Sequence, residues 1–247
     1  MSETRAHSRE EFLICALGRE LVGCRHVAVG SAGSLHGAAA LLASALSEPP
    51  ARVTILGSAA DTFFSDGGRE LFDAAIQGRI DGFVLGGGQI DGEANINFLG
   101  RGTYPRLSVR WPGNFGSPVM YSVVKRVVLF REEHSPRVFV PRVDFVSAAG
   151  RPPRGAYRPG GPSALVTGKC VFAFDRPAHR FALKSIHPGV TLAELRAATG
   201  FDFDAPDAPP TTAPPSAREL SILRGDVAQR IARTYPAFAA QAFGVAT

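Results

Sequence analysis

Between residues 26 and 88, three short apolar runs each end in glycine, and their spacing indicates the fold. They are HVAVG (26–30), VTILG (53–57) and FVLGGG (83–88). Runs of this length are typical of strands that are buried on both faces. Residues 34–46 and 66–77, which lie between them, carry the composition and the boundary signals of helices. The alternation predicts βαβ units, and therefore a largely parallel sheet with helices on both faces.

The pattern changes after residue 100, where short strand-like runs follow one another without long helices. We expect strands at 107–109, 127–130, 138–140 and 143–146, and β hairpins built from 165–167, 171–174 and 181–183. Capping boxes beginning at Ser8, Thr191 and Ser216 each predict the start of a helix, the first over about 8–22. We expect one α/β domain over 1–247, in which a Pro-rich connector (204–216) leads to a helical tail (216–247).

The composition places the chain among globular proteins. It has 247 residues, of which 45% are hydrophobic and 20% charged. No apolar run approaches the roughly 20 residues that span a bilayer, and the polar amino terminus is unlike a secretory signal, so we expect a cytoplasmic protein without membrane contact. Cys15, Cys24 and Cys170 show no C-x-x-C spacing and the histidines are scattered, so we expect neither disulfides nor a metal site.

The charges are distributed unevenly along the chain. Residues 1–100 hold seven Arg and twelve acidic residues, a net charge of −5, whereas residues 101–200 hold sixteen basic and five acidic residues, a net charge of +11. This basic middle segment contains no basic run with interleaved aromatic residues, so we do not expect a nucleic-acid partner. Three explanations for its positive charge stay open: it binds an anionic ligand, it contacts an acidic partner subunit, or it is simply a solvated surface.

The glycine loops after the three strands are candidates for ligand binding. They contain Gly30, Ser31 and Gly33, then Gly57 and Ser58, then Gly86, Gly87 and Gly88. The carboxyl ends of parallel strands meet at one edge of a sheet, and glycine leaves backbone N–H groups free to hold an anion there. The alternative is that these glycines only close tight turns. No Walker A loop or complete G-x-G-x-x-G is present, which disfavours a nucleotide triphosphatase or an ordinary dehydrogenase.

Amide side chains follow the third strand closely. Gln89, Asn95 and Asn97 could hydrogen-bond a carbonyl or a carboxylate, although Asn and Asp also favour simple capped turns. A further glycine-bearing loop at 111–116 contains Gly113 and Asn114. A Ser/His/Asp triad is not predicted, because the sequence contains no G-x-S-x-G elbow.

Taken in order, these motifs resemble the β-type subunits of family I coenzyme A transferases, especially the glutaconate CoA-transferase branch. The matching stretches are VAVG (27–30), GGQID (87–91), NIN (95–97), the 110–116 loop, KRVV (125–128), VDFV (143–146), CVFAF (170–174), SIHPGV (185–190) and TGF (199–201). The resemblance implies an open three-layer α/β/α sandwich that pairs with an α-type subunit in a hetero-oligomer. Its substrates would be an acyl-CoA, with coenzyme A carried as substrate, and a carboxylic acid.

The resemblance also implies a nucleophilic glutamate directly after the second strand, and the chain departs from the family at this point. Gly57 stands there, and no glutamate lies between Glu48 and Glu70. In a related branch, two-subunit hydrolases that open a ring in steroid-derived acyl-CoA esters, the β-type subunit also lacks the nucleophile and the α-type subunit supplies the glutamate. Three hypotheses follow: a transferase, a ring-opening hydrolase, and a non-catalytic subunit that binds CoA esters.

Within these hypotheses we assign roles to the strand-end residues. The N–H groups of Gly87 and Gly88 would hold the thioester oxyanion, Gln89 and Asn95 would hold the acyl group, and Ser58 would orient a water or a partner's carboxylate. The other residues expected to line the site are Gly30, Ser31, Gly33, Gly57, Gly86, Asn97, Gly113 and Asn114. The basic middle segment would then attract the phosphates of coenzyme A.

Overall fold

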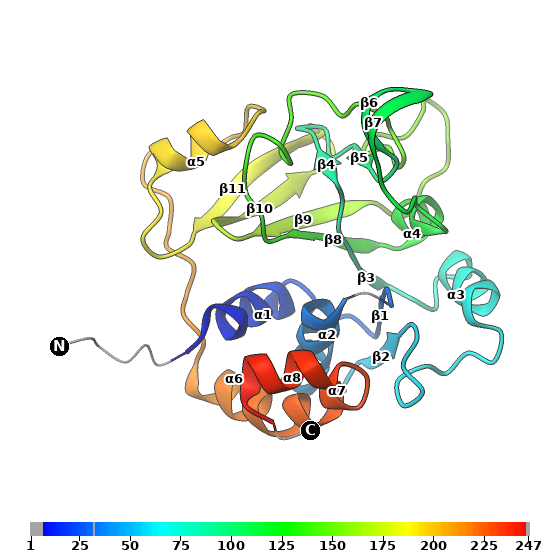
Figure 1. The fold of residues 1–247 in the computed structure, drawn as a ribbon, viewed down its shortest axis with the longest axis vertical. Helices are drawn as coiled ribbons and strands as arrows, with labels where there is room; N and C mark the ends of the chain where they lie inside the picture. Colours follow the sequence, from blue (N-terminus) through cyan, green and yellow to red (C-terminus); the bar gives the residue numbers. More distant parts are fainter. Residues whose placement is uncertain (1–6, 32, 246–247) are drawn as a thin grey trace.

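A seven-stranded sheet forms the centre of the molecule in a computed structural model that describes residues 7–31 and 33–245 (Figure 1). The strand order is β11-β10-β9-β8-β3-β1-β2. Its strands are β1 (His26–Val29), β2 (Arg52–Ile55), β3 (Gly82–Leu85), β8 (Arg126–Arg131), β9 (Pro162–Thr167), β10 (Cys170–Asp175) and β11 (Arg180–Ile186). Strands β2, β1, β3, β8 and β9 run parallel, and β10 and β11 extend the sheet as antiparallel hairpins. The predicted fold class is confirmed.

Helices and hairpins cover the two faces of this sheet, as Figure 1 shows. One face carries α1 (Arg9–Arg19), α2 (Ser34–Leu46) and the carboxyl-terminal helices α6 (Ala217–Ile222), η1 (Leu223–Val227), α7 (Ala228–Ala232) and α8 (Pro236–Phe243). The other face carries α3 (Gly67–Ile76), α4 (Ser117–Val123) and α5 (Leu192–Ala198), together with the hairpins β4 (Gln89–Ile90)–β5 (Ile96–Asn97) and β6 (Gly100–Thr103)–β7 (Arg106–Arg110).

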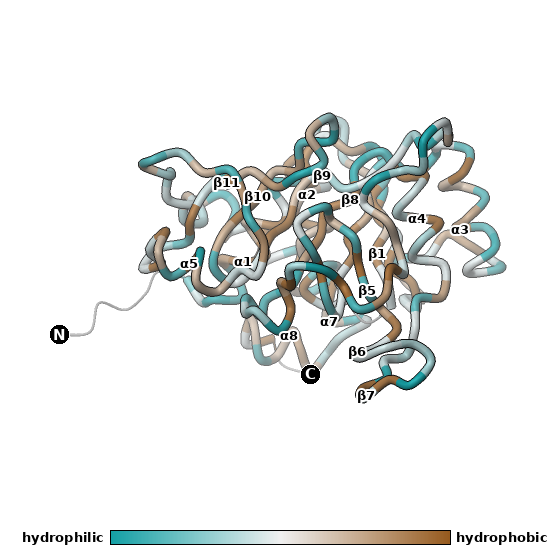
Figure 2. Tube along the Cα trace, turned by 90° about the horizontal axis from the view of Figure 1, so that it is seen from above, coloured by the Kyte–Doolittle hydropathy of each residue, from teal (hydrophilic) through white to brown (hydrophobic). Residues whose placement is uncertain are grey.

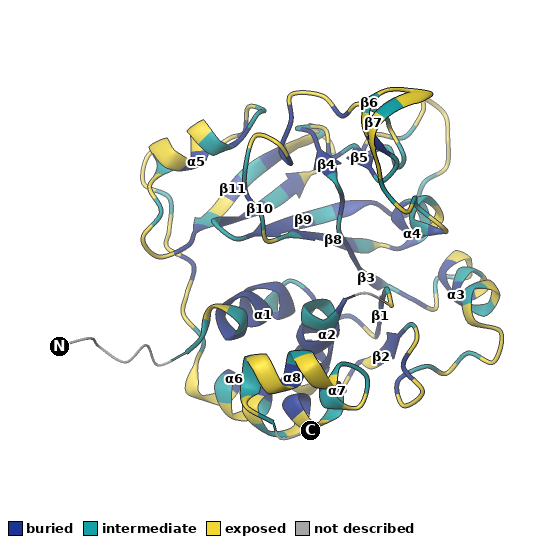
Figure 3. Cartoon of the chain, in the orientation of Figure 1, coloured by how far each residue is buried: buried dark blue, intermediate teal, exposed yellow. Residues whose placement is uncertain are grey.

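Alternating side chains of each strand divide the core into two layers. In β1, Val27 and Val29 pack against α1 and α2, whereas Ala28 packs on the opposite face with Leu71 of α3. This is the period of two that a strand imposes on its side chains. Figure 3 shows that α1 and α2 are largely buried, while α5 and the β6–β7 hairpin present exposed surface. The β6–β7 hairpin lies at the margin of the molecule in both orientations (Figure 1, Figure 2).

The three predicted capping boxes are present. The side chains of Ser8, Thr191 and Ser216 each accept the backbone N–H three residues on, and a glutamate at that position bonds back. Each pair satisfies two N–H groups that the first helical turn leaves open. The boxes start α1, α5 and α6 where the sequence places them.

The predicted strands at 138–140 and 143–146 are wrong. This segment makes only isolated bridges, between Phe139 and Ile90 and between Ala148 and Ile96. Its apolar side chains are buried against the β4–β5 hairpin, but Pro141 lacks the N–H that a continuous ladder requires. Burial by packing alone gives the same apolar pattern as a strand.

The carboxyl-terminal helices close over α1 and α2. Leu223, Val227 and Ile231 enter the same core layer as these two helices. The Pro-rich segment 204–216 runs along β11 and contacts it at two isolated bridges. The organisation as one domain with a connector and a tail stays a prediction. Across residues 7–31 and 33–245, no helix combines the length and the apolar character needed to cross a membrane.

Candidate active site

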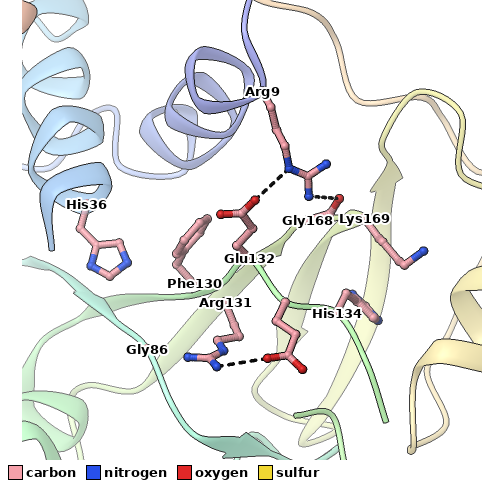
Figure 4. A pocket seen from close by; sticks show the side chains of 10 residues that line it. Arg9, His36, Gly86, Phe130, Arg131, Glu132, His134, Gly168 and Lys169 are labelled. Atoms are coloured by element: carbon pink, nitrogen blue, oxygen red, sulfur yellow. Dashed lines mark hydrogen bonds and ion pairs between the residues drawn. The ribbon is translucent and has the colours of Figure 1, made fainter. Parts of the chain in front are cut away.

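A cavity of about 690 Å³ opens beyond the carboxyl ends of β3, β8 and β9 (Figure 4). We refer to it as the first cavity. Charged side chains that follow β8 and β9 line it together with a glycine loop and the first turn of α2. The lining residues are Arg9, His36, Gly86, Phe130, Arg131, Glu132, Glu133, His134, Gly168 and Lys169. Its position is the ligand-binding edge expected for an open parallel sheet.

A second cavity of about 440 Å³ adjoins the first and shares Arg131 and Glu133 with it. Aromatic and aliphatic side chains form much of its wall, and arginines surround it. The lining residues are Gly88, Phe98, Arg101, Val109, Trp111, Pro112, Gly113, Arg131, Glu133, Arg137 and Val138. The two cavities therefore lie on either side of the loop of residues 86–88.

Two glycines of the 86–88 loop border the cavities: Gly86 lines the first and Gly88 the second, whereas Gly87 between them is buried. A Cβ atom on Gly88 would lie 2.2 Å from the Trp111 ring, so only glycine lets the indole pack against this backbone. The N–H of Gly88 donates to the carbonyl of Asn97 at 2.9 Å. Within the described part of the chain, the N–H groups of Gly86 and Gly87 meet no acceptor. The predicted oxyanion contact of Gly88 is therefore corrected, because its N–H is already used in the hairpin.

Two glutamates line the first cavity, and each is held by a cation. Glu132 accepts from Arg9 Nε at 2.8 Å, in a pair whose side chains are both more than half exposed. Glu133 accepts from Ser135 Oγ at 2.8 Å and from Arg137 Nη2 at 2.8 and 2.9 Å. The hydrogen bond from Ser135, followed by that from Arg137, lowers the pKa of Glu133. Glu133 is thus a fully paired carboxylate.

Two histidines line the same cavity in different ways. The ring of His36 reaches from α2 and packs edge-on against Phe130, and desolvation lowers its pKa to about 4. The ring of His134 is buried, with Nδ1 2.8 Å from Thr167 Oγ1 and Nε2 2.9 Å from Thr199 Oγ1. Burial lowers the pKa of His134 to about 3. Of the two, only His36 has ring nitrogens without a hydrogen-bond partner among the described residues.

The predicted amide side chains are bonded within their own hairpin. Asn97 is fully buried, donates to Gln89 Oε1 and to the carbonyl of Gly100 at 2.7 Å each, and accepts from the N–H groups of Leu99 and Gly100. Gln89 Oε1 also accepts from the N–H of Asp144 at 3.0 Å. These contacts show both amides shaping the loop next to the cavities.

Asn95 lies elsewhere. Its side chain donates to Asp91 Oδ2 at 3.1 Å and accepts from the N–H of Gly150 at 3.0 Å. It borders a different cavity, lined also by Arg142 and Phe201. The structure therefore does not bring Asn95 together with the loop of residues 86–88. Its predicted role in holding the acyl group has no geometric support.

The loops after β1 and β2 are fastened by the carboxyl-terminal helices. Ser58 is buried, and its Oγ accepts from the Asp61 N–H at 3.1 Å and from Thr234 Oγ1 at 2.7 Å. The Tyr235 hydroxyl donates to the carbonyl of Ser31 at 2.7 Å. In this structure Ser58 holds the loop, and its predicted catalytic role stays a prediction.

The remaining predicted glycines differ in their surroundings. Gly57 has φ +85°, the left-handed region that favours glycine, and the side chain of Ser31 lies 3.4 Å from where its Cβ would be. Gly30 has open space around it, and Gly33 caps α2 with the ring of His36 close by. Gly113 lines the second cavity, whereas Asn114 lies in the same loop and accepts the Ser117 N–H through its carbonyl.

The charged residues of the first cavity were not among the residues predicted from the sequence. Arg131, Glu132 and Lys169 lie one or two residues beyond the runs at 127–130 and 165–167, so the strand-end rule that selected the glycines would also have selected them. Arg9 and His36 come from helices, and no local pattern pointed to them. Within the described residues, no three His, Cys, Asp or Glu side chains gather as metal ligands.

A family model described as Coenzyme A transferase matches residues 25–198, which is most of the chain. The chain belongs to the coenzyme A transferase family. All seven strands of the central sheet and the residues of both cavities, apart from Arg9, fall within the matched region. The family predicted from the order of the motifs is confirmed.

Two curated relatives show what the chain resembles in detail. The B subunit of 3-oxoadipate CoA-transferase from Pseudomonas knackmussii is 34% identical over 68% of this chain and 66% of its own length. The cholesterol ring-cleaving hydrolase IpdB subunit of Rhodococcus jostii is 34% identical over 63% of this chain and 62% of its own length. The chain therefore spans a little under two thirds of each of these relatives. The chain is thus equally similar, at 34% identity, to a transferase subunit and to a hydrolase subunit.

Solved structures agree with the fold. The crystal structure of Rhodococcus jostii IpdAB has a TM-score of 0.77 and 27% identity, covering 89% of this chain and 94% of that chain. A variant of the decarboxylase AibA/AibB has a TM-score of 0.74 and 26% identity, covering 88% of this chain and 94% of that chain. Proteins with this fold are thus named for transfer, hydrolysis and decarboxylation. The fold alone does not choose between these reactions.

Proposed function

We propose that this chain is the β-type subunit of an enzyme that acts on an acyl-CoA thioester, with the reacting carbonyl at the junction of the two cavities. The observation that carries the proposal is that the N–H groups of Gly86, which lines the first cavity, and of the adjacent Gly87 meet no acceptor among the described residues, at the edge where a parallel sheet binds ligands. An acyl-transfer site needs backbone donors of this kind for the oxyanion of its tetrahedral intermediate.

The charge of the first cavity supports an anionic ligand such as coenzyme A. Arg131 and Lys169 line it, and Lys169 Nζ makes no ion pair within the described part of the chain. Both residues belong to the basic middle segment of the sequence. Cations near the mouth of a cleft attract phosphate groups and speed their association.

In this proposal the chain does not supply the covalent nucleophile. Gly57 stands where the family resemblance places a glutamate, and the neighbouring hydroxyl of Ser58 is engaged by Thr234 and Asp61. An α-type partner would supply the catalytic carboxylate, in keeping with relatives named as B subunits and as the pairs IpdAB and AibA/AibB. Water or a second carboxylic acid would then attack the thioester carbonyl.

Ring-opening hydrolysis of a cyclic acyl-CoA is the second candidate. Among the described residues that line the first cavity, the carboxylates are Glu132 and Glu133, and both are paired with arginines. A chain without a free carboxylate at this place suits a hydrolase in which the partner activates water. In a third candidate function, the subunit binds CoA esters in the same cavity but no reaction takes place there.

The experiment uses the complex of this chain with its α-type partner. Release of free coenzyme A from adipyl-CoA and hexanoyl-CoA is followed with and without acetate as acceptor, and adducts are trapped with borohydride or hydroxylamine. Turnover that requires acetate, with an adduct on either subunit, indicates transfer. Release without acceptor or adduct indicates hydrolysis. Absence of both turnover and coenzyme A binding contradicts the proposal.

Lys169→Gln and Lys125→Gln form a matched pair for this experiment. Lys125 is exposed and lines neither cavity, whereas Lys169 lines the first. Loss of the half-buried charge of Lys169 near bound phosphate is expected to weaken the binding of coenzyme A by about threefold to tenfold, while Lys125→Gln leaves this affinity unchanged. Equal effects of the two changes would mean that the first cavity does not bind coenzyme A.

A further inference from the structure

His36 is a polar side chain of the first cavity to which the proposed function gives no role. It stands in the first turn of α2, and Figure 4 shows its ring directed from this helix into the cavity, on the side of Phe130. The ring packs edge-on against Phe130, with centroids 5.2 Å apart, and its nitrogens have no hydrogen-bond partner among the described residues. The protein therefore holds this imidazole by packing and leaves its polar atoms to a ligand.

Gly33 makes room for this orientation of the ring. It is the N-cap residue of α2, and a Cβ atom on it would lie 2.6 Å from His36 Nδ1 and 3.1 Å from His36 Cγ. The φ angle of Gly33, −117°, lies outside the left-handed region, so the glycine serves the close approach and not the backbone. Gly33 thus lets the ring fold back over the start of the helix.

The carboxyl-terminal helices fasten the first turn of α2 and the loop before it. Ile231 Cδ1 lies 2.9 Å from where a Cβ on Gly37 would be, so the side chain of Ile231 fills the space that this glycine leaves beside His36. The Tyr235 hydroxyl donates to the carbonyl of Ser31 in the preceding loop. A polar group that is held in this way needs little reorganisation when it meets a ligand.

The ring of His36 is neutral, and its single proton belongs on Nε2. Desolvation lowers the pKa of His36 to about 4, so the ring carries no charge near pH 7. A neutral imidazole has one N–H donor and one acceptor nitrogen. Nδ1 lies close to the N-cap residue, where the open N–H groups of the first helical turn favour an acceptor. Nε2, the nitrogen farther from the backbone, is then the donor.

We infer that His36 is a catalytic residue of the proposed reaction, in which its Nε2–H donates a hydrogen bond to the carbonyl oxygen of the acyl-CoA thioester. It joins the N–H of Gly86, which lines the same cavity and meets no acceptor among the described residues. This inference rests on the proposed function, because it assumes that the thioester lies beside the 86–88 loop.

The role of the two donors follows from the movement of electrons in acyl transfer. An oxygen nucleophile forms a C–O bond to the thioester carbon, and the π electrons of the carbonyl move onto its oxygen. The N–H groups of His36 and Gly86 stabilise this oxyanion. The C=O bond then forms again, the C–S bond breaks and coenzyme A leaves as the thiolate. His36 keeps its proton throughout.

The test measures turnover of adipyl-CoA and hexanoyl-CoA by the complex with the α-type partner, and binding of both thioesters and of free coenzyme A by calorimetry. His36→Leu removes the donor but keeps an apolar contact for Phe130, so kcat should fall by about 100-fold. This loss should exceed any loss of affinity for free coenzyme A, which has no thioester carbonyl, by at least about tenfold. His36→Gln retains an N–H group and should keep kcat within about tenfold of the unmodified complex.

Gly33→Ala tests the same contact while leaving the imidazole in the sequence. The added Cβ would lie too close to Nδ1, so it should displace the ring and lower kcat toward the His36→Leu value. In the double variant Gly33→Ala/His36→Leu the two losses should not add, because both changes remove one hydrogen bond. His7→Gln, at a histidine that lines neither cavity, is the control and should leave kcat unchanged.

A spectroscopic measurement tests the contact without turnover. This chain is labelled with ¹⁵N-histidine and combined with its unlabelled partner, and the His36 Nε2 signal is assigned by its loss in His36→Leu. Hexanoyl-CoA should shift this signal more than free coenzyme A does, because only the thioester brings a carbonyl to Nε2. Binding of hexanoyl-CoA with no such difference would overturn the inference.

The outcomes separate the inference from the proposed function. Full turnover of the thioesters by His36→Leu overturns the inference and leaves the proposed function intact. Additive losses in the double variant also overturn it, because Gly33 and His36 would then act independently. If the unmodified complex binds neither thioester nor coenzyme A, the proposed function fails and the inference fails with it.

Discussion

Two polar regions lie at the same edge of the sheet and differ in how their hydrogen bonds are used. The amide hairpin, residues 89–97, carries Gln89 and Asn97, whose amide groups bond to one another and to nearby backbone. The first cavity, beyond β8 and β9, carries Lys169 without an ion pair among the described residues and Arg131 with a buried, unpartnered Nε. In the first region the polar side chains hydrogen-bond within the protein and support its structure. In the second region polar groups are still available to bind a ligand.

A polar residue is a good candidate for ligand binding only if it both lies at the right edge of the sheet and has hydrogen-bonding groups that the protein does not already use. Both regions follow buried strands, so both meet the positional rule for a ligand site in a parallel sheet. A buried polar group that already has its partners contributes to stability and rigidity. A group without a partner beside a cavity is available for recognition. Substitutions in the first region should therefore lower stability, whereas substitutions in the second should weaken ligand binding.

Acidification is expected to have the largest effect on the free energy of unfolding, because it protonates two buried histidines whose ring nitrogens are already hydrogen-bonded within the protein. Thr199 Oγ1 donates to the carbonyl of Leu195, so it accepts from His134 Nε2, and burial favours the neutral form of this ring. His187 is likewise placed between Thr212 Oγ1 and the carbonyl of Thr167. Burial lowers the pKa to about 3 for His134 and to about 4 for His187.

The lowered pKa values mean that stability falls as the pH falls. The unfolded chain binds protons near pH 6.5, before the folded chain does, so the stability that the neutral rings contribute is complete at pH 7 and is lost as the pH falls toward 4. We expect a loss on the order of several kcal/mol, measured by chemical denaturation at pH 7, 6, 5 and 4. His134→Gln should flatten this dependence, while His7→Gln should not. A pH-independent free energy of unfolding between 7 and 4 would contradict the assignment.

Asn97→Ala should produce the next largest effect, and it should act on stability. The change removes the side-chain partner of the Gly100 carbonyl and N–H in a buried place, and it leaves Gln89 Oε1 with only its bond from the Asp144 N–H. The free energy of unfolding should fall by about 3 kcal/mol. Asn114→Ala is the control, since the bond made by Asn114 uses its backbone carbonyl, and it should cost less than about 0.5 kcal/mol. A loss of coenzyme A affinity without loss of stability would place Asn97 in the binding region instead.

Gly57→Glu should cost about 1–2 kcal/mol, because the backbone there has φ +85°. Gly30→Ala, where the backbone and the space permit a side chain, should be tolerated. If Gly57 occupies the nucleophile position of the family, the new glutamate should form a thioester adduct that borohydride traps and mass spectrometry maps to residue 57. A folded variant with no adduct there would count against this placement.

Glu132→Gln should have the smallest effect. Its pair with Arg9 is exposed on both sides, and such pairs contribute roughly 0–1 kcal/mol. Since we propose that the partner supplies the catalytic carboxylate, turnover of adipyl-CoA should fall by less than about tenfold. A complete loss of turnover at unchanged thermal stability would make Glu132 the catalytic carboxylate of this chain.

Much of the fold could be predicted, because buried strands that end in glycine leave a strong local pattern. The segment 138–146 misled the prediction, since Val138 and Phe139 are buried by packing without a ladder. The β4–β5 hairpin was missed because its strands have two residues each. For the proposed site, strand-end reasoning selects an edge of the sheet, but it did not select the charged side chains that line the cavity there. Whether Asn97 is free or bonded depends on partners such as Gly100 and Gln89, which spacing does not reveal.

The central claim, that an acyl-CoA lies at the junction of the two cavities, can be tested through Trp111. It is the only tryptophan of the chain, and its ring packs on Gly88. The chain is labelled with 5-fluorotryptophan, combined with its unlabelled partner and titrated with adipyl-CoA while the ¹⁹F signal is followed. We predict a saturable shift whose midpoint matches the calorimetric dissociation constant. Calorimetric binding of adipyl-CoA with no change in the Trp111 signal would contradict the account.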